Sequence, residues 1–448
     1  MTRGAETRSL ATAPFGSPFG NESLLDDARP TLRPMNGVTD KPHLLVLTST
    51  FPRWRDDHEP PFVYELCRRL TAHFSVTVVA PHAAGAARSE TLDGIEVRRF
   101  RYAPMALQQL AYDGGIPTKI RARPWLGILV PGFVLSQLLS ARRILQEHDT
   151  SVIHAHWIVP GGLIGALLSA FAGQGCRLLV TAHGGDVYGL NGALATRVKR
   201  WVLRRADHVT VVGSALAQQV NLHGDLDGKL SVLPMGTDLS ETFVPAPRQT
   251  ATPTVIYAGR LVEKKGVDVL LRALASARER VPELQLIIAG HGPAQPALET
   301  LCRQLAIGDA VRFTGPYRMH ELPRIYADAQ LAVFPFRAAA GGDQDGFGLA
   351  VVEAMGCGIP VVGSDIAPLD DLLIDGATAL RAKTNDAEAF ADAIVECLAN
   401  PQAARQRASA ARAHVLAHYD WQVIAARYAE LLRAPVNAEN VRPSPQDS

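Results

Sequence analysis

The sequence predicts an α/β protein built from two Rossmann-like, doubly wound domains that face a central cleft. Short runs of β-branched and aliphatic residues, apolar on both faces, alternate with longer helical segments. This alternation is typical of parallel sheets that are covered by helices on both sides. The pattern stops at a bridge rich in Pro and Thr and then starts again, which predicts two domains of similar size within the 448 residues.

The predicted strands follow one another in two sets. The first set occupies residues 43–49, 75–81, 95–100, 151–156, 177–183, 208–213 and 229–234. The second set occupies residues 254–260, 284–290, 310–315, 331–336 and 359–365. We therefore place the first domain at residues 42–235 and the second at residues 250–415. Ligands of doubly wound sheets bind beyond the carboxyl ends of the strands, so the cleft between the two halves is the expected site.

The two ends of the chain read differently from the domains. Residues 1–41 have little hydrophobic periodicity and many turn formers, which predicts a disordered N-terminal extension. A short break at Tyr419 and Asp420 precedes the last helical segment. We expect the helix within residues 416–434 to pack back on the first domain, and residues 435–448 to form a tail.

Composition excludes several classes of protein. The chain has 45 basic and 44 acidic side chains, a formal charge of +1, and is therefore not a nucleic-acid binder driven by bulk charge. Five scattered cysteines without a C-x-x-C pair indicate neither a disulfide framework nor a zinc site. The first forty residues lack a secretory signal, and no apolar run reaches the roughly 18 residues of a spanning helix. These features favour a soluble, cytoplasmic protein.

One segment nevertheless suggests membrane contact. Residues 121–143 have an apolar stretch that begins at Trp125, is interrupted by Pro131, and is flanked by arginines at both ends. Such a composition suits a position at an anionic interface, which would place the protein peripherally at the cytoplasmic face of the inner membrane. A buried helix interrupted by Pro131 explains the segment equally well.

A basic pair stands where the second set of strands begins. Arg260 ends the first strand of that set and Lys265 follows five residues later, at the start of a helix. Lysine is scarce in this chain, at seven residues, so adjacent lysines at this junction are unexpected from composition. Two cations beside a helix N-terminus can hold a diphosphate. For an isolated R-x4-K pair, a solvated basic loop is the simpler interpretation.

A pair of carboxylates comes later in the second domain. Asp345 precedes a Gly-Phe-Gly turn, and Glu353 lies eight residues further on, inside the following helix. Carboxylates accept paired hydrogen bonds from vicinal hydroxyls, as on a ribose or a hexose, and the glycines let the backbone approach a ligand closely. Taken alone, this pattern fits a helix N-terminal acid and an exposed Glu about as well.

Together these segments resemble the signature of retaining glycosyltransferases of family 4, which have the GT-B fold. The carrying stretches are GRLVEKKGVDVLL from Gly259 and DGFGLAVVEAMGCGIPVV from Asp345, with TSTFPRW, VIHAHW, TAHGGDVY and LPMGTD in the first half. The resemblance spans roughly residues 43–432. It departs from the family at Asp345, where Glu is usual, at Met235, and in the loop of residues 53–62.

The resemblance implies a role for particular residues. It implies a nucleotide-sugar donor, UDP- or GDP-linked, bound mainly by the second domain as a co-substrate, with no cofactor. It implies that Arg260 and Lys265 stabilise the departing diphosphate, that Glu353 holds the ribose, and that Asp345 and His183 contact the donor sugar. The catalytic set is thus His183, Arg260, Lys265 and Asp345, and the substrate-binding set is Gly184, Asp186, Gly259, Gly346, Phe347, Gly348, Leu349 and Glu353.

Two patterns raise the question of a metal. Asp343, Gln344 and Asp345 form a D-x-D triplet, but in the second of two Rossmann-like halves this is the wrong context for a metal-binding triplet. His154 and His156 share one face of a strand, yet no third ligand accompanies them. We expect no metal, because two cations already face the diphosphate.

The resulting hypothesis is a metal-independent, retaining transferase. It moves a hexose from a nucleotide sugar to a hydroxyl of a saccharide or lipid-linked acceptor, in cell-surface polysaccharide or glycolipid biosynthesis. One alternative is a nucleotide-sugar 2-epimerase of the same fold, which product analysis without an acceptor would distinguish. A second alternative, a two-lobed binding protein of periplasmic type, is disfavoured by the missing export signal.

Overall fold

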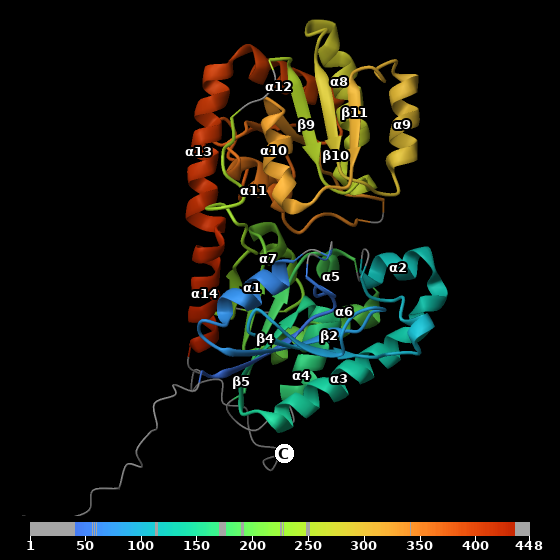
Figure 1. The fold of residues 1–448 in the computed structure, drawn as a ribbon, viewed down its shortest axis with the longest axis vertical. Coiled ribbons are helices and arrows are strands. Elements are labelled where there is room, and N and C mark those ends of the chain that lie inside the picture. Colours follow the sequence, from blue (N-terminus) through green and yellow to red (C-terminus); the bar gives the residue numbers. More distant parts are fainter. Residues whose placement is uncertain are drawn as a thin grey trace, which may run out of the picture. The chain divides into compact units, whose positions relative to one another are not determined.

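The computed structural model describes residues 41–434 except residues 56, 58, 60, 113–114, 170–175, 190–191, 225, 227, 248–250 and 341. The predicted N-terminal extension, apart from Lys41, and the predicted tail lie outside the described residues. Within the described part, two mainly parallel sheets are covered by helices, which confirms the predicted α/β, doubly wound class (Figure 1).

The first sheet has eight strands in the order β3-β4-β2-β1-β5-β6-β7-β8. Their bounds are β1 His43–Leu47, β2 Ser75–Pro81, β3 Ser89–Leu92, β4 Ile95–Phe100, β5 Thr150–His156, β6 Arg177–Ala182, β7 His208–Val211 and β8 Leu230–Val232. Every residue of β1 is buried, because helices cover both faces of the sheet. The strand order reverses between β1 and β5, so the ligand crevice of this domain is expected where β5 and β6 end.

One edge of the first sheet departs from the predicted parallel arrangement. β3 runs antiparallel to β4, and the two are joined by Asp93 and Gly94, whose φ angles are 45° and 81°. A two-residue turn with both φ angles positive is typical of an Asp-Gly hairpin. The sequence does not predict this hairpin, because β3 is short, has no buried residue and therefore has no apolar run.

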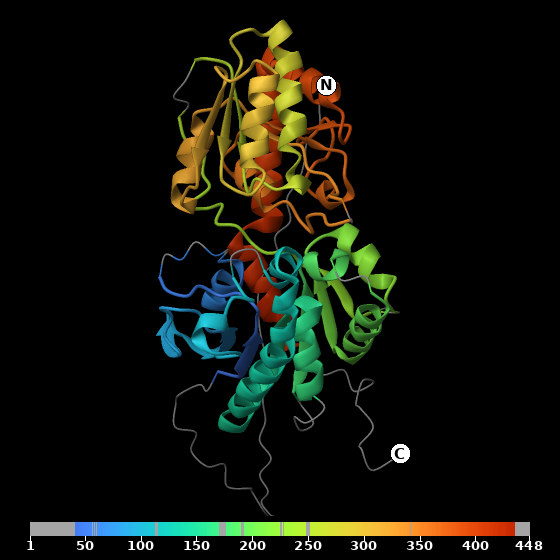
Figure 2. The same ribbon diagram turned by 90° about the vertical axis from the view of Figure 1, so that its right-hand side faces the viewer.

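Helices connect the strands of the first sheet. Their bounds are α1 Phe62–Leu70, η1 Met105–Leu107, α2 Ile116–Ala122, η2 Pro124–Leu129, α3 Val130–Glu147, η3 Trp157–Gly162, α4 Leu163–Ser169, α5 Gly185–Tyr188, α6 Ala193–Arg205 and α7 Ser214–Asn221. α3 and α4 lie side by side (Figure 2). The buried Gln137 of α3 donates hydrogen bonds to the carbonyls of Thr48 and Val79, which ties this helix to β1 and β2.

The second sheet has six parallel strands in the order β11-β10-β9-β12-β13-β14. Its strands are β9 Thr254–Ala258, β10 Gln285–Ala289, β11 Val311–Gly315, β12 Leu331–Phe334, β13 Val361–Ser364 and β14 Leu380–Ala382. Its helices are η4 Glu263–Lys265, α8 Val267–Arg280, α9 Gln295–Gln304, η5 Met319–Glu321, α10 Leu322–Ala327, α11 Leu349–Gly356, η6 Ala367–Leu369 and α12 Ala387–Ala399. β14, which has three residues, was not predicted.

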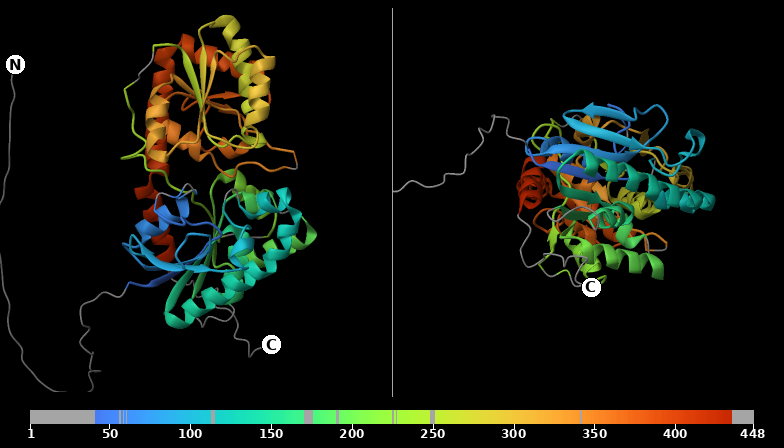
Figure 3. Two further views of the ribbon diagram at one scale, coloured as in Figure 1. Left: turned by 45° about the vertical axis from the view of Figure 1, so that its right-hand side comes forward. Right: turned by 90° about the horizontal axis from the view of Figure 1, so that it is seen from below.

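Two consecutive helices end the described chain (Figure 3). α13 (Pro401–Tyr419) contributes Val415 and Tyr419 to the core of the second domain. α14 (Trp421–Arg433) contributes Ile424 and Tyr428 to the core of the first. The break between them is Asp420, whose side chain accepts a hydrogen bond from the backbone N–H of Gln422 and so caps α14. The last helix thus packs on the first domain.

Candidate active site

Lys265 lies where β9 is connected to α8, at the carboxyl end of a central strand. The connection passes through Gly259 and Gly266, whose φ angles are 150° and 63°. A Cβ at Gly266 would overlap the carbonyl oxygen of Pro335, so the backbone is held closely against the neighbouring loop. The ammonium of Lys265 lies 3.8 Å from the ring centre of Phe336, in a cation–π contact.

Asp345 is the ion-pair partner of Lys265. A second cation, the ammonium of Lys264, lies 3.3 Å from the other carboxylate oxygen of Asp345. Burial by itself would raise the pKa of Asp345, but the two lysines outweigh it and lower the pKa. The structure therefore brings Lys265 and Asp345 together as a charged pair near neutral pH.

Glu353 is buried inside α11, with 8% of its surface exposed. Its carboxyl group has no hydrogen-bond partner among the residues that the structure describes. Burial raises its pKa to about 8, although Lys265 acts in the opposite direction. A buried, unpartnered carboxyl group is a ready acceptor for the hydroxyls of a ligand.

This raised pKa predicts a pH dependence of stability. The carboxyl of Glu353 titrates near 4.5 in the unfolded chain and near 8 in the folded one, so between these values the unfolded state has lost a proton that the folded state keeps. The contribution of Glu353 to the free energy of unfolding is therefore fully present below pH 4.5. It is lost as the pH rises from 4.5 to about 8, by up to about 1.4 kcal/mol per pH unit.

Glu353→Gln, which resembles the protonated carboxyl, should remove this dependence. We expect urea unfolding to show that the variant gains stability relative to the wild type between pH 5 and pH 8. Parallel pH profiles of the two proteins would contradict the assignment.

Arg260 is placed differently from Lys265. Its side chain is exposed, and among the described residues it makes no hydrogen bond or ion pair through its guanidinium group. Its carbonyl oxygen accepts a hydrogen bond from the buried hydroxyl of Tyr257, at 3.0 Å. The structure thus does not join Arg260 to the cluster of Lys265 and Asp345.

In the first domain, His183 begins the loop between β6 and α5. Asp186 holds this loop, because its carboxylate accepts hydrogen bonds from the backbone N–H groups of His183 and Gly184, both at 3.1 Å. It also accepts one from Ile158 at 2.7 Å, which joins the ends of β5 and β6. Asp186 is buried, so its contacts explain it as a residue that shapes the loop.

The imidazole of His183 lies among aromatic rings. The ring centres of Trp157 and Phe62 are 4.8 Å and 5.1 Å away, and His156 is hydrogen-bonded to it. Burial, assisted by the nearby His154, lowers the pKa of His183 to about 3. His183 is therefore neutral near pH 7, and the residue as a whole is partly exposed.

The loops that carry His183 and Asp345 meet through glycines. A Cβ at Gly184 would lie 2.6 Å from the Cα of Gly346, and a Cβ at Gly346 would lie 2.5 Å from the carbonyl oxygen of His183. Only glycine permits this approach of the two backbones. The predicted residues His183, Gly184, Asp345 and Gly346 are thus neighbours.

The rest of the Gly-Phe-Gly turn packs in the same region. Phe347 and Leu349 are partly buried against the core of the first domain. A Cβ at Gly348 would lie 2.7 Å from the side chain of Leu369. A further contact, which the sequence did not predict, is made by Asp371: its carboxylate accepts hydrogen bonds from the backbone N–H and the hydroxyl of Ser214, at 2.7 and 2.6 Å.

The side chains of the D-x-D triplet and of the histidine pair contact other residues. Asp343 lies 3.3 Å from the ammonium of Lys264 and 3.7 Å from the guanidinium of Arg121. His154 is hydrogen-bonded to Thr181 at 2.8 Å. Among the described residues, no group of three or more His, Cys, Asp or Glu side chains is arranged to hold a metal.

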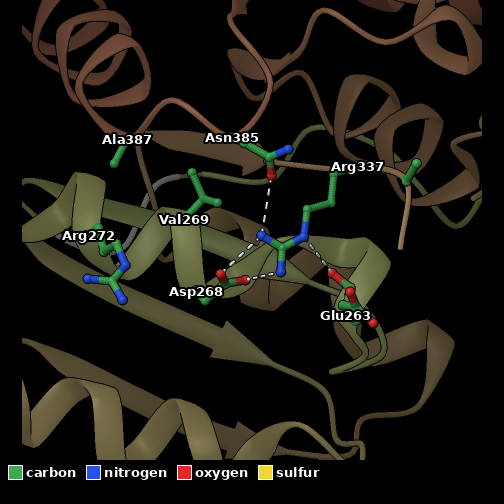
Figure 4. Close-up of a pocket in the computed structure, with 8 residues that line it drawn as sticks. Glu263, Asp268, Val269, Arg272, Arg337, Asn385 and Ala387 are labelled. Carbon is green, nitrogen blue, oxygen red and sulfur yellow. Dashed lines mark hydrogen bonds and ion pairs between the residues drawn. The ribbon is translucent and has the colours of Figure 1, made fainter. Parts of the chain in front are cut away.

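A surface pocket lies behind the loop that carries Lys265. Figure 4 shows Arg337 at its centre, ion-paired with Asp268 at 2.9 Å and donating to the carbonyl of Glu263. The backbone N–H of Arg337 also donates to the carbonyl of Lys264. These contacts fix η4 and the start of α8 from the outside, so we assign them to the support of the loop.

The segment of residues 121–143 is not a buried helix. Trp125, Ile128, Leu135 and Leu139 are exposed by 50%, 80%, 55% and 50%. The helix Pro124–Glu147 is long and apolar enough to cross a membrane by length and composition alone, which the sequence had not led us to expect, and 22% of its most apolar window is buried. One side of the helix, with Leu126, Phe133 and Ile144, is buried, whereas the apolar side chains on its other side are uncovered.

Known protein families match both halves of the chain. Residues 61–241 match the family model described as Glycosyltransferase Family 4, and residues 240–414 match the one described as Glycosyl transferases group 1. The chain is 32% identical over 306 residues to the GDP-mannose-dependent alpha-(1-6)-phosphatidylinositol monomannoside mannosyltransferase of Mycolicibacterium smegmatis, covering 65% of this chain and 78% of that protein. It is 29% identical over 301 residues to the glycogen synthase of Mycobacterium tuberculosis, covering 66% and 71%.

Solved structures resemble the whole described fold. Sucrose-phosphate synthase from Thermosynechococcus elongatus has a TM-score of 0.72 at 24% identity, covering 88% of this chain and 98% of that one. Anabaena HepE in complex with UDP-glucose has a TM-score of 0.66 at 20% identity, covering 87% and 99%. At these identities the likeness concerns the fold alone. None of these four proteins is named as an epimerase, so the comparisons do not favour the epimerase alternative.

Proposed function

Because this chain belongs to the group 1 glycosyltransferases of family 4 with the GT-B fold, we propose that it transfers a hexose from a nucleotide sugar to a hydroxyl acceptor with retention of anomeric configuration. The observation that carries this proposal is the meeting of the His183 and Asp345 loops beside Lys265. A neutral imidazole, a carboxylate and an ammonium group there match the needs of a sugar linked to a diphosphate.

In this proposal the residues of the second domain hold the donor. Lys265 stabilises the charge that develops on the departing diphosphate, and Lys264 supports it through Asp345. Glu353 accepts hydrogen bonds from the ribose hydroxyls, and Asp345 accepts them from the sugar. With these cations in place the reaction needs no divalent metal, and no cofactor besides the donor.

We propose a GDP- or UDP-linked hexose as donor, with GDP-mannose as the first probe. The mycobacterial relative that supports this choice is described as GDP-mannose-dependent. Its name also supports a glycolipid acceptor, and thus a role in glycolipid or polysaccharide biosynthesis. Asp345 stands at the position expected to contact the sugar.

The test of this function is a donor panel. The purified protein is heated with GDP, UDP, ADP, GDP-mannose and UDP-glucose, each with EDTA and again with magnesium. We expect one nucleotide class to raise the melting temperature equally in both conditions, and transfer from the matching sugar nucleotide to give product of the donor's anomeric configuration. Stabilisation by none of them would overturn the proposal.

We further propose that the first domain touches an anionic membrane through the helix Pro124–Glu147. Its exposed apolar side chains, described above, are accompanied by the exposed Arg121, Arg123, Arg142 and Arg143. Basic side chains beside an uncovered apolar face suit the surface of anionic lipids. Such a position would bring a lipid-linked acceptor to the site from the cytoplasmic side.

This surface gives a prediction with a matched control. Ile128→Glu should reduce co-sedimentation with anionic liposomes at low salt by about tenfold, because a charge replaces the most exposed apolar side chain of the helix. Leu194→Glu, at an equally exposed position (75%) on α6, should leave it unchanged. Binding that is lost in neither variant, or absent in the wild type, would refute the membrane contact.

A further inference from the structure

The imidazole of His183 is hydrogen-bonded to a second histidine that the proposed function does not use. His156 ends β5, the neighbouring parallel strand, and its Nδ1 lies 3.0 Å from Nε2 of His183. The ring centres are 5.2 Å apart with an interplanar angle of 22°. A hydrogen bond between two neutral imidazoles uses one proton, so the tautomer of one ring determines that of the other.

Both rings are neutral near pH 7. Burial lowers the pKa of His156 well below its ordinary value, and His154 and His183 add to this effect. The pKa of His183 is lowered in the same way. Each ring therefore carries one proton, on one of its two nitrogens.

The other ring nitrogen of His156 determines which of the two imidazoles donates the hydrogen bond between them. Its Nε2 is buried and has no hydrogen-bond partner among the described residues. Buried N–H groups without an acceptor are rarer and more costly than acceptors without a donor. His156 therefore keeps its proton on Nδ1 and donates it to Nε2 of His183, which leaves the proton of His183 on Nδ1.

A third histidine packs against the ring of His156. The ring centre of His154 lies 4.2 Å from that of His156 with the planes inclined at 37°, and the ring centre of Tyr428 of α14 lies 5.6 Å from that of His154. His154 is in turn hydrogen-bonded to Thr181. This buried packing keeps Nδ1 of His156 directed at His183.

We infer that His156 is a positioning residue that fixes His183 as the Nδ1–H tautomer. The inference rests on the proposed function, since the tautomer matters for the reaction only if His183 faces the sugar. Nδ1 of His183 makes no hydrogen bond among the described residues, so its N–H is free to donate. An N–H donor can bind a sugar oxygen, but it cannot take a proton from an acceptor hydroxyl. His183 is therefore a hydrogen-bond donor and not the general base.

The direct test is nitrogen-15 NMR of the full chain labelled at histidine. His183→Gln identifies the signals of His183 among the 14 histidines. We expect these signals to show a proton on Nδ1 and an unprotonated Nε2 in the wild type. A proton on Nε2 of His183 would overturn the inference. This readout needs no substrate, so it stands apart from a failure of the donor panel.

Variants of His156 connect the tautomer to catalysis. His156→Asn keeps an N–H donor at the position of Nδ1 and should preserve both the tautomer of His183 and most of the turnover. His156→Leu removes this donor. It should lower turnover with GDP-mannose or UDP-glucose about tenfold or more, without a comparable change in the KM of the donor. His208→Asn, at the start of β7 and hydrogen-bonded to Ser231, is the control and should leave the tautomer unchanged. Equal losses in the Asn and Leu variants of His156 would overturn the inference.

Discussion

Replacing Lys265 by alanine is expected to lower turnover by about a hundred- to a thousandfold, the typical cost of losing one preorganised charge at a developing anion. The ammonium of Lys265 is the ion-pair partner of Asp345 and opposes the rise that burial causes in the pKa of Glu353. Its removal therefore takes away the charge that faces the diphosphate and leaves Asp345 without its closest cation. The steady-state rate with the donor found in the nucleotide panel measures the effect.

Lys264→Ala is the matched control. Lys264 has the same charge and forms ion pairs with Asp343 and Asp345. Its side chain is more exposed, at 25%, than that of Lys265, at 15%. We expect it to cost about tenfold or less, because a more hydrated charge acts less strongly. Circular dichroism checks that both variants are folded. Wild-type turnover in folded Lys265→Ala would remove Lys265 from the mechanism.

Replacing Gly266 by alanine is expected to destabilise the fold by about 3–5 kcal/mol. The residue has a φ angle of 63°, which disfavours any side chain, and an added Cβ would overlap the carbonyl oxygen of Pro335. Relief of this clash requires the backbone beside Lys265 to move. We therefore also expect reduced activity in any folded fraction. Urea unfolding followed by circular dichroism measures the loss.

Gly376→Ala separates the cost of the positive φ angle from the cost of the clash with Pro335. Gly376 has a similar φ angle of 70°, but no atom lies within 4 Å of its added Cβ. Only the backbone penalty applies there, so we expect a loss of about 1 kcal/mol. Equal losses at Gly266 and Gly376 would show that the contact with Pro335 is not what requires glycine.

The sequence predicted those parts of the molecule that follow from local pattern. The apolar runs located nearly all strands, because a parallel strand buried on both faces is mostly apolar along its length. The pair of Lys265 and Asp345 came from motif resemblance, and the structure brings these residues together. Arg260 shared the motif, yet its side chain is exposed, since position at a strand end does not determine the direction of a long flexible side chain.

The sequence does not predict which side chains on different strands contact each other. His156 and His183 are 27 residues apart, and only the pairing of β5 with β6 brings their rings together. The same holds for Asp186, which resembled a ligand-binding residue but accepts three backbone hydrogen bonds, one of them from Ile158. The composition of residues 121–143 fitted burial and exposure equally, because an apolar side chain does not reveal whether a neighbour covers it.

The return of α14 to the first domain changes how the chain is divided. Thr237 and Asp420 form a parallel bridge, with Thr237 donating to the carbonyl of Tyr419 and Trp421 donating to that of Thr237. The point where the chain leaves the first domain thus touches the point where it comes back. In topological terms the second domain is an insertion with adjacent ends. A cut near residue 235 would leave the first domain without Trp421, Ile424 and Tyr428, whereas excision of residues 238–419 with a short linker would keep its core whole.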